Sequence, residues 1–210
     1  MEHQSQVEGN EEMRALDLFC GLGGWSDGLA MEGFEVLGVE IEPEIAGLYK
    51  HPVMVADVRD LNGKDFQDYD LIVGSPPCRD FSEIGRVFGH LWKNPPNPKQ
   101  GLTMIHAFLR IVEEAKPTYW LMENVSYLTR FLDLKPRVET YLSPSMKRCF
   151  WGNFPAFLVS KDYEKPRFLK RTKKGMRRAV YVGKHEQWKR AQIPLPIARA
   201  LGRAIREALS

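Results

Sequence analysis

The sequence predicts an α/β protein built on a doubly wound, mostly parallel sheet, and two patterns lead to this prediction. Over the first 125 residues, short apolar segments alternate with amphipathic ones, as expected when helical crossovers join parallel strands. Residues capable of binding or chemistry also follow the predicted strands, and ligands in such sheets bind at the carboxyl ends of strands. The length of 210 residues allows one such domain with a full core.

The first predicted strand, residues 14–19, runs into a glycine-rich turn. The turn, residues 20–24 (CGLGG), precedes a helical pattern over residues 25–31. Strand, glycine turn and helix form the entry of a doubly wound domain, where glycine lets the backbone approach a ligand at the helix N-terminus. Taken alone, the same pattern is also compatible with a plain tight turn.

An acidic residue follows each of the next two predicted strands. Glu40 ends the strand over residues 34–39, where it can accept hydrogen bonds from the ribose hydroxyls of a nucleotide-type cofactor. A helix follows over residues 43–50, because proline and acidic residues favour its first turn. The strand over residues 51–56 then ends at Asp57.

The next predicted strand, residues 69–73, stops at a glycine and two prolines. Proline lacks a backbone N–H and pushes the preceding residue towards an extended conformation, so residues 74–82 (GSPPCRDFS) form a stiff loop. The loop presents Cys78, and the neighbouring cation of Arg79 favours the nucleophilic thiolate. A buried structural cysteine is the alternative, because free cysteine is among the most buried residue types.

The other segments of the first 125 residues favour the interpretation of Cys78 as a nucleophile over that of a buried structural cysteine. Residues 79–100 form a long loop of the kind that often covers a site, followed by a helix over 101–115 and a strand over 118–122. Glu123 sits at the carboxyl end of that strand. The glycine turn, two acids, Cys78 and Glu123 thus all follow strand ends, which is not expected of purely structural residues.

The chain changes character after a second predicted helix that begins near Ser126. Residues 148–155 are aromatic and strand-like, and the last helix, residues 197–209, has an apolar face that must pack on the sheet. We therefore divide the chain into a disordered tail (1–13), a main domain (14–154), a small basic region (155–190) and a C-terminal segment (191–210) whose helix packs back on the main domain.

Composition excludes several classes of protein. A hydrophobic content of 43% and a charged content of 27% are ordinary for a globular protein. The apolar runs are too short to cross a membrane, and the polar first residues do not resemble a signal peptide. Cys20, Cys78 and Cys149 lack the paired spacing of a metal site and suit a reducing cytosol. We therefore expect a cytoplasmic protein without a membrane anchor or a metal.

Charge is distributed very unevenly along the chain. The formal net charge is only +3, yet residues 1–134 hold 11 Lys and Arg against 22 Asp and Glu, whereas residues 135–190 hold 16 against 4. In the basic segment the cations alternate with aromatic residues, which is typical of a nucleic-acid contact because phosphate neutralisation dominates such affinity. A solvated basic surface is the alternative.

Four stretches together resemble the motifs of the cytosine-5 DNA methyltransferases, in the order found in that family. Residues 17–24 (DLFCGLGG) resemble the turn that binds S-adenosylmethionine (SAM), residues 74–82 the catalytic Pro-Cys loop, and residues 123–125 (ENV) the Glu-Asn-Val motif. Residues 194–202 (PLPIARALG) are similar to the motif that opens the last helix of the family. The resemblance covers residues 14–125 and about twenty C-terminal residues.

The resemblance implies a Rossmann-like fold and transfer of a methyl group from SAM to C5 of a cytosine flipped out of double-stranded DNA, through a bond between Cys78 and C6. Glu123 would contact N3 and the exocyclic amine of that base. The main domain would be the SAM-binding catalytic domain, and residues 155–190 a target-recognition region too small to read more than a short or loosely defined site. We expect a monomer in bacterial or phage-infected cytoplasm, with a role in DNA methylation such as restriction–modification.

The same resemblance assigns the site residues to three groups. The catalytic residues would be Cys78, Glu123, Ser82 and Arg148. SAM would be held by Phe19, Gly21, Leu22, Gly23, Gly24, Glu40, Ile41, Asp57, Val58, Pro77 and Gln192. The DNA contacts would be Arg79, Arg86, Lys170, Arg171, Lys173, Lys174, Arg177 and Arg178.

Two positions depart from the family pattern. The Gln-x-Arg-x-Arg motif, which supplies an arginine near the target base, has no clean match, and Arg148 is the nearest equivalent. Gln192 stands where the family has an asparagine near the methyl donor. Three other functions stay open: an RNA cytosine-5 methyltransferase, an amino-methyltransferase, and an inactive methyltransferase-like DNA-binding protein. Cys78 and Glu123 together disfavour the last two.

Overall fold

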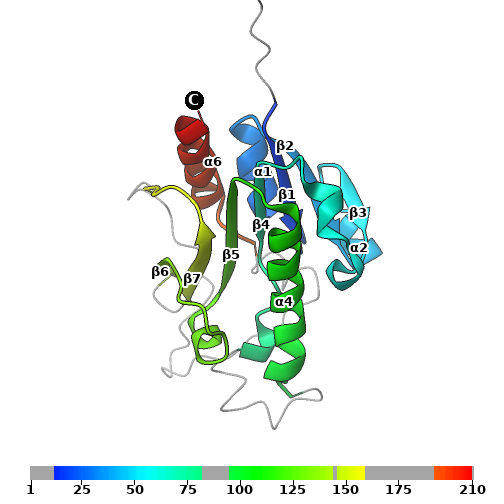
Figure 1. Ribbon diagram of the computed structural model, residues 1–210, viewed down its shortest axis with the longest axis vertical. Helices are drawn as coiled ribbons and strands as arrows, with labels where there is room; N and C mark the ends of the chain where they lie inside the picture. Colours follow the sequence, from blue (N-terminus) through cyan, green and yellow to red (C-terminus); the bar gives the residue numbers. More distant parts are fainter. Residues whose placement is uncertain (1–11, 82–94, 144–145, 159–191, 210) are drawn as a thin grey trace, which may run out of the picture.

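The computed structural model describes residues 12–81, 95–143, 146–158 and 192–209. Over these residues the chain forms a seven-stranded sheet with the order β3-β2-β1-β4-β5-β7-β6, with helices on its faces, which confirms the predicted α/β class (Figure 1). The strands are β1 (Arg14–Leu18), β2 (Glu35–Glu40), β3 (Val53–Val55), β4 (Leu71–Gly74), β5 (Tyr119–Val125), β6 (Val138–Ser143) and β7 (Met146–Asn153). The α-helices are α1 (Gly24–Met31), α2 (Pro43–Ala46), α4 (Pro98–Ala115) and α6 (Leu195–Leu209).

The five neighbouring strands from β3 to β5 are parallel, and this arrangement brings their carboxyl ends to one edge of the sheet. Leu18, at the end of β1, pairs with Val39 of β2 on one side and with Gly74 of β4 on the other. The chain therefore leaves β1 in one direction and later returns to its opposite side. Such a change of direction is the topological switch point at which ligands bind in doubly wound sheets.

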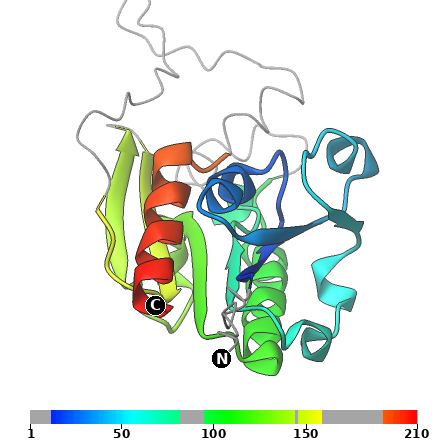
Figure 2. The same cartoon turned by 90° about the horizontal axis from the view of Figure 1, so that it is seen from above.

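Helices cover both faces of this sheet (Figure 2), with α1 and α6 side by side on one face and α4 on the other. The helices α1 and α6 approach closely because Gly28 has no side chain: a Cβ there would lie 2.4 Å from the Cβ of Ala198. Arg199 of α6 also pairs with Glu32 at the end of α1, with 2.6 Å between Nε and Oε1. The C-terminal helix is thus joined tightly to the helix that follows the glycine turn.

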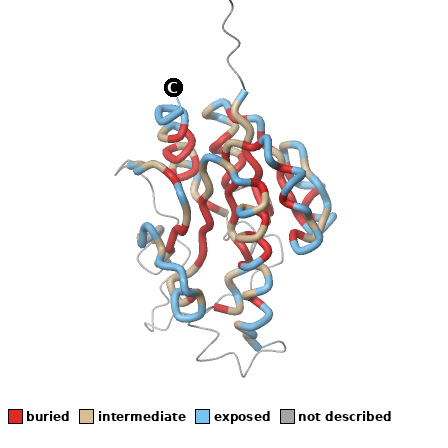
Figure 3. Tube along the Cα trace, viewed as in Figure 1, coloured by how far each residue is buried: buried red, intermediate tan, exposed pale blue. Residues whose placement is uncertain are grey.

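Each face of the sheet carries its own apolar core. Figure 3 shows that the central strands, which separate the two cores, are buried. Successive side chains of a strand point to opposite faces, so Ile72 joins the core beneath α4 while Leu71 and Val73 join the core beneath α1 and α6. All three side chains are fully buried. Burial of a side chain of this size contributes about 1.5–3 kcal/mol, so β4 is held firmly at the centre of the sheet.

The prediction of a helix from Ser126 is wrong. Residues Ser126–Arg130 form only a short 3-10 turn, η5, after which the chain enters β6, a strand that the sequence reasoning missed. Pro136 lacks a backbone N–H and keeps Lys135 out of the helical conformation, so a helix from Ser126 could not have extended beyond residue 134. The strand β6 is defined by antiparallel pairing with β7, a partner that local periodicity does not reveal.

Several element boundaries also differ from the prediction, and three of these differences have a clear local cause. Helix α2 ends at Ala46 rather than near residue 50, because Gly47 follows it. Helix α4 begins earlier, at Pro98, because the side chain of Asn97 accepts a hydrogen bond from the backbone of Gln100 and caps the helix. Strand β5 continues to Val125, because β7 pairs with it over its whole second half.

The expectations about a membrane span, the N-terminal tail and the basic region can be compared only with the described residues. No helix within them combines the length and the apolar character needed to cross a bilayer. Most of the predicted N-terminal tail (1–11) and most of the predicted basic region (159–190) lie outside the described residues.

Candidate active site

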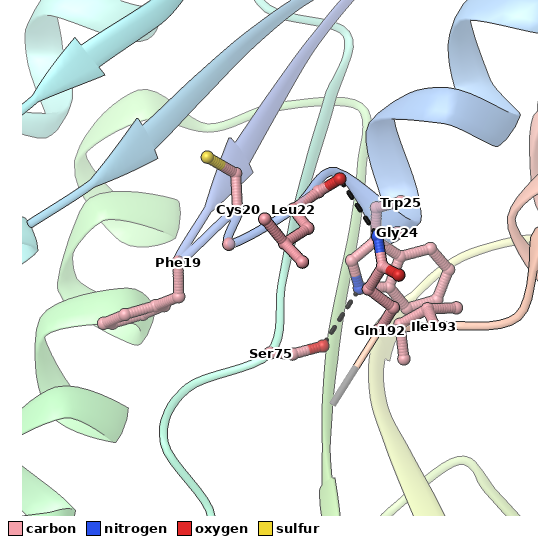
Figure 4. A pocket seen from close by; sticks show the side chains of 9 residues that line it. Phe19, Cys20, Leu22, Gly24, Trp25, Ser75, Gln192 and Ile193 are labelled. Carbon is pink, nitrogen blue, oxygen red and sulfur yellow. Dashed lines mark hydrogen bonds between the residues drawn. The ribbon is translucent and has the colours of Figure 1, made fainter. Parts of the chain in front are cut away.

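Two adjacent cavities lie at the carboxyl ends of the parallel strands, with volumes of about 240 Å³ and about 60 Å³. They are adjacent because Phe19 and Ser75 line both. The larger cavity is otherwise lined by Val39, Glu40, Ile41, Ala56, Asp57, Val58, Pro76, Pro77, Cys78, Met104, Glu123 and Arg148. The smaller cavity (Figure 4) is otherwise lined by Cys20, Gly21, Leu22, Gly24, Trp25, Gln192 and Ile193.

The backbone of the glycine turn explains its sequence. Phe19, Gly21 and Gly23 have φ angles of 62°, 55° and 87°, in the left-handed region that glycine tolerates best. Gly24 lies directly against the C-terminal segment, where a Cβ would come within 2.5 Å of the backbone nitrogen of Ile193. The turn is therefore narrow and rigid, and it is covered on one side by residues 192–193.

Gln192 continues this contact. Its side-chain amide donates a hydrogen bond of 3.0 Å to the carbonyl of Leu22, as the dashed line in Figure 4 shows. The departure from the family asparagine thus places a longer amide side chain directly on the glycine turn.

The carboxylate of Glu40 connects the turn after β1 with the turn after β2. The residue is only 3% exposed. Its Oε2 accepts a hydrogen bond of 3.1 Å from the backbone N–H of Gly21, and its Oε1 accepts one of 2.9 Å from Glu42. Each oxygen keeps a second acceptor position, because a carboxylate oxygen has two lone pairs. Beside it, the exposed side chain of Ile41 adds an apolar surface to the larger cavity.

Asp57 also lines the larger cavity and already has a hydrogen-bond partner. Its carboxylate accepts hydrogen bonds from the backbone and the guanidinium of Arg59, and these bonds hold the pKa of Asp57 below its usual range. The neighbouring Val58 is buried and lines the same cavity.

A buried polar cluster lies behind the glycine turn. Ser26 of α1 donates a hydrogen bond of 2.6 Å to Oδ2 of Asp17 and lies 2.5 Å from the hydroxyl of Tyr49. The other oxygen of Asp17 is buried and has no hydrogen-bond partner within the described part of the chain. Burial raises the pKa of Asp17 to about 7, with a smaller opposing effect from Ser26.

This shift predicts a stability that depends on pH. The folded protein binds the Asp17 proton more tightly than an unfolded chain, so the stabilisation is complete below about pH 4 and is lost as the pH rises to about 7. We expect Asp17→Asn to remove this dependence. Between pH 5 and pH 8 the free energy of unfolding of the wild type should fall by on the order of 3 kcal/mol relative to that of the variant. Urea unfolding at both pH values measures the change. Asp133→Asn, at an exposed position, is the control, and a parallel response of both variants would contradict the prediction.

The loop that carries Cys78 is held at both ends. The side-chain amide of Asn124 donates a hydrogen bond of 2.9 Å to the carbonyl of Pro76. Beyond the cysteine, the carboxylate of Asp80 accepts a hydrogen bond of 2.9 Å from the backbone of Asn97, and Phe81 is fully buried against Gly101. Cys78 is consequently presented to the larger cavity, partly exposed, on a loop fixed to β5 and α4.

Glu123 and Arg148 form an ion pair beside this thiol. In the antiparallel register Phe150 lies opposite Glu123, so Arg148, two residues away, projects from the same face of the sheet. Its Nε lies 2.6 Å from Oε1 of Glu123. Oε1 is nevertheless buried without a well-aligned hydrogen bond, so the contact is a charge pair whose acceptor can still receive a hydrogen bond from a ligand.

Burial dominates the acidity of both reactive groups. It raises the pKa of Glu123, and the ion pair with Arg148 and a hydrogen bond from Ser75 oppose this only in part. Burial likewise raises the pKa of the Cys78 thiol; Arg148 lowers it, whereas Glu123 and Asp80 raise it. The cation with the largest effect on Cys78 is therefore Arg148, and not the adjacent Arg79 from which the sequence reasoning started.

The structure brings most of the predicted site residues together. Nine of them line the larger cavity and five the smaller one, with Phe19 in both. Gly23 lines neither cavity and shapes the turn, and Arg79 is exposed outside both. Eight predicted residues lie outside the described part of the chain: Ser82, Arg86, Lys170, Arg171, Lys173, Lys174, Arg177 and Arg178.

Sequence reasoning missed three residues that shape the site. Ser75 lines both cavities, Trp25 donates a hydrogen bond to it, and Met104 of α4 adds an apolar side chain to the larger cavity. Ser75 could have been noticed from its place in the Cys78 loop. Trp25 and Met104 reach the site only through helix packing, which leaves no local sequence signal. Among the residues described, no group of three or more His, Cys, Asp or Glu side chains is arranged to hold a metal ion.

A doubly wound sheet with two cavities at its switch point, a cysteine on a Pro-Pro loop and a buried Glu–Arg pair together define an α/β fold with a candidate active site. The profile of the family described as C-5 cytosine-specific DNA methylase matches residues 13–190. The chain belongs to this family.

Individual relatives agree with the assignment. The chain is 32% identical over 136 residues to the Type II methyltransferase M1.HphI of Haemophilus parahaemolyticus, covering 59% of this chain and 35% of the relative. It is 33% identical over 141 residues to M.HindV of Haemophilus influenzae, covering 62% and 43%. It is 31% identical over 123 residues to M.HgiGI of Herpetosiphon aurantiacus, covering 54% and 90%. The chain thus spans less than half the length of the first two relatives.

The fold also has a counterpart among solved structures. A protein described as a DNA modification methyltransferase encoded within an E. coli prophage superimposes with a TM-score of 0.50 at 23% identity, covering 67% of this chain and 46% of that one. At this identity the likeness supports the fold alone.

Proposed function

We propose that the chain transfers a methyl group from SAM to C5 of a flipped-out cytosine in double-stranded DNA, with Cys78 bonded to C6 of the base during the reaction. The observation that carries the proposal is that Cys78 and the Glu123–Arg148 pair face one cavity of about 240 Å³, which six of the eleven predicted SAM residues also line. Family membership supports the same reaction.

The residues present fit SAM. The immobilised carboxylate of Glu40 keeps acceptor positions for two ribose hydroxyls, and Ile41 offers an apolar surface for adenine. Val58 and Pro77 extend that surface, while Phe19 reaches both cavities, so the smaller one beside Gln192 can take the amino-acid end. Asp57 fits less simply, because an adenine amine would share its carboxylate with Arg59. When bound, SAM supplies an electrophilic methyl group.

Cytosine needs help from the protein because its C5 is not nucleophilic. As the Cys78 thiolate bonds to C6, electron density moves towards C5 and N3, and C5 becomes able to accept a methyl group. A base then removes the C5 proton, the C5–C6 double bond re-forms, and the thiolate of Cys78 leaves. C6 is inaccessible inside a duplex, so the cytosine must leave the base stack and enter the larger cavity.

Glu123 and Arg148 supply the electrostatics of this step. Because burial raises the pKa of Glu123, its protonated form can donate a hydrogen bond to N3 as negative charge develops there. The buried Oε1, which has no well-aligned donor, can accept a hydrogen bond from the exocyclic amine. Arg148 favours the thiolate of Cys78, which burial alone would disfavour.

The basic segment completes the proposal. Its lysines and arginines at 170–178 would contact the phosphates of the duplex, and the small size of the region is consistent with a short recognition site. Arg79, exposed beside the Cys78 loop, and Arg86 would contact DNA close to the target base.

Duplex DNA that carries 5-fluorocytosine tests the function directly. Fluorine at C5 cannot leave as a proton does, so the Cys78–C6 bond should persist after methyl transfer and give a denaturant-resistant adduct. We expect the adduct only with both SAM and Cys78 present, as judged by gel shift and by mass spectrometry of the cross-linked peptide. Cys78→Ser and omission of SAM are the controls. An adduct with structured RNA but not with duplex DNA would overturn the choice of substrate, and no adduct with either would overturn the reaction.

A further inference from the structure

Ser75 lines both cavities, and its side chain lies close to functional groups of two different elements, helix α1 and strand β5. Its Oγ accepts a hydrogen bond of 3.1 Å from the indole Nε1 of Trp25, shown as a dashed line in Figure 4. Ser75 directly follows Gly74, which pairs with Met122 of β5, so it lies beside Glu123, and both residues line the larger cavity. Its hydroxyl lowers the pKa of the Glu123 carboxyl, against the larger effect of burial. Ser75 is thus the physical link between helix α1 and the Glu123–Arg148 pair.

The direction of these two hydrogen bonds follows from the chemistry of the groups. An indole N–H can only donate, so Ser75 must act as the acceptor towards Trp25. The single hydroxyl proton then remains for a second partner, and the neighbouring carboxyl of Glu123 can accept it. The indole therefore fixes the orientation of the serine proton.

Trp25 is well suited to this role because its side chain is buried and packed against a neighbouring ring. Its side chain is only 2% exposed and packs edge-on against Phe150, with 6.3 Å between ring centroids and an interplanar angle of 67°. Phe150 is the β7 residue directly opposite Glu123. The orientation of the serine hydroxyl is therefore set by the same strand that carries Arg148.

We propose that Ser75 is a positioning residue for Glu123: oriented by the Trp25 indole, its hydroxyl holds the carboxyl beside Arg148 in the orientation that the target base requires. The inference rests on the proposed function, since a fixed carboxyl matters only if a base binds there. Within the described residues, the other charged or titratable groups beside Glu123 are Cys78 from the loop after β4 and Arg148 from β7. None of them replaces the neutral hydroxyl of Ser75 as a hydrogen-bond donor fixed by α1.

The titration of the Glu123 carboxyl in the free protein tests this role without any methyl transfer. Carbon-13 NMR of protein labelled at the glutamate carboxyl follows the signal, which Glu123→Gln identifies by its loss. Ser75→Ala should move the midpoint to higher pH, because the serine hydrogen bond favours the carboxylate. Ser75→Thr keeps the hydroxyl, and its extra methyl group can enter the adjoining cavities, so its midpoint should stay near that of wild type. Ser126→Ala, a serine just beyond β5, is the matched control.

Trp25→Phe separates orientation from the hydroxyl itself, because it keeps an aromatic ring against Phe150 and removes the N–H. We expect Trp25→Phe to raise the midpoint of the Glu123 titration less than Ser75→Ala does. In a protein that already carries Ser75→Ala, Trp25→Phe should not change the midpoint further. In parallel, kcat for Ser75→Ala should fall by up to about 100-fold, because displacement of a catalytic group lowers rates by about this factor. Ser75→Thr should restore kcat.

Two results would overturn the positioning role. One is a midpoint in Ser75→Ala equal to that of Ser126→Ala, and the other is an effect of Trp25→Phe that is as large without Ser75 as with it. If the wild-type protein showed no methyl transfer, that result would overturn the proposed function instead. The NMR titration would still decide whether Ser75 holds Glu123.

Discussion

Replacement of Cys78 by serine should abolish methyl transfer to cytosine while leaving SAM binding nearly unchanged. A serine hydroxyl does not ionise near neutral pH, so it cannot supply the nucleophile that C6 requires. The expected loss of turnover is roughly 10⁴-fold or more, as when a covalent nucleophile is removed from an enzyme. Binding of SAM should survive, because Glu40 and the glycine turn, which we expect to hold its ribose and amino-acid end, do not contact Cys78.

Two measurements on the same preparations check this result: methyl incorporation into duplex DNA, and calorimetric titration with SAM. Cys149→Ser is the matched control, since Cys149 is a fully buried thiol of β7 that lines neither cavity. It should keep turnover at the cost of some stability. Turnover retained by the Cys78 variant would remove this thiol from the reaction, and loss of SAM binding would show that its role is structural.

Replacement of Arg148 by alanine should lower kcat by roughly 10²- to 10³-fold, the range for loss of one preorganised electrostatic contact. Arg148 lowers the pKa of both Cys78 and Glu123, against the larger effect of burial on each. Without it both pKa values rise, so less thiolate is present near neutral pH and the rise of activity with pH should move to higher pH. The unpaired buried carboxyl should also destabilise the fold by about 3–5 kcal/mol.

The pH profile of kcat/KM and urea unfolding measure the two effects separately. Arg148→Lys should recover part of the activity, since it restores the charge without the planar guanidinium. Lys147→Ala is the neighbouring control: Lys147 pairs with Glu139 of β6 instead of facing the site. An Arg148→Ala profile that coincides with wild type would exclude this residue from the site electrostatics.

The central parallel strands were accessible from the sequence because their signals are local. Each is a short apolar run bounded by glycine, proline or an acid, and alternation with helices constrains such strands to run parallel. The carboxyl-end rule then gathers Phe19, Glu40, Asp57, Cys78 and Glu123 at one edge without any knowledge of coordinates. The second half of the chain was less accessible: β6 was missed, since its pairing with β7 depends on residues outside its own segment.

The sequence by itself determined the central strands, the glycine turn and the order of the groups at the switch point, because periodicity and chain order decide them. Only the tertiary structure decided which groups act on each other. Arg148 reaches Glu123 because antiparallel β7 inserts between β5 and β6 in one particular register. Ser75 acquires a fixed direction because α1 docks with the Trp25 indole beside it. Such contacts depend on register and packing between distant segments, for which a single sequence carries no local signal.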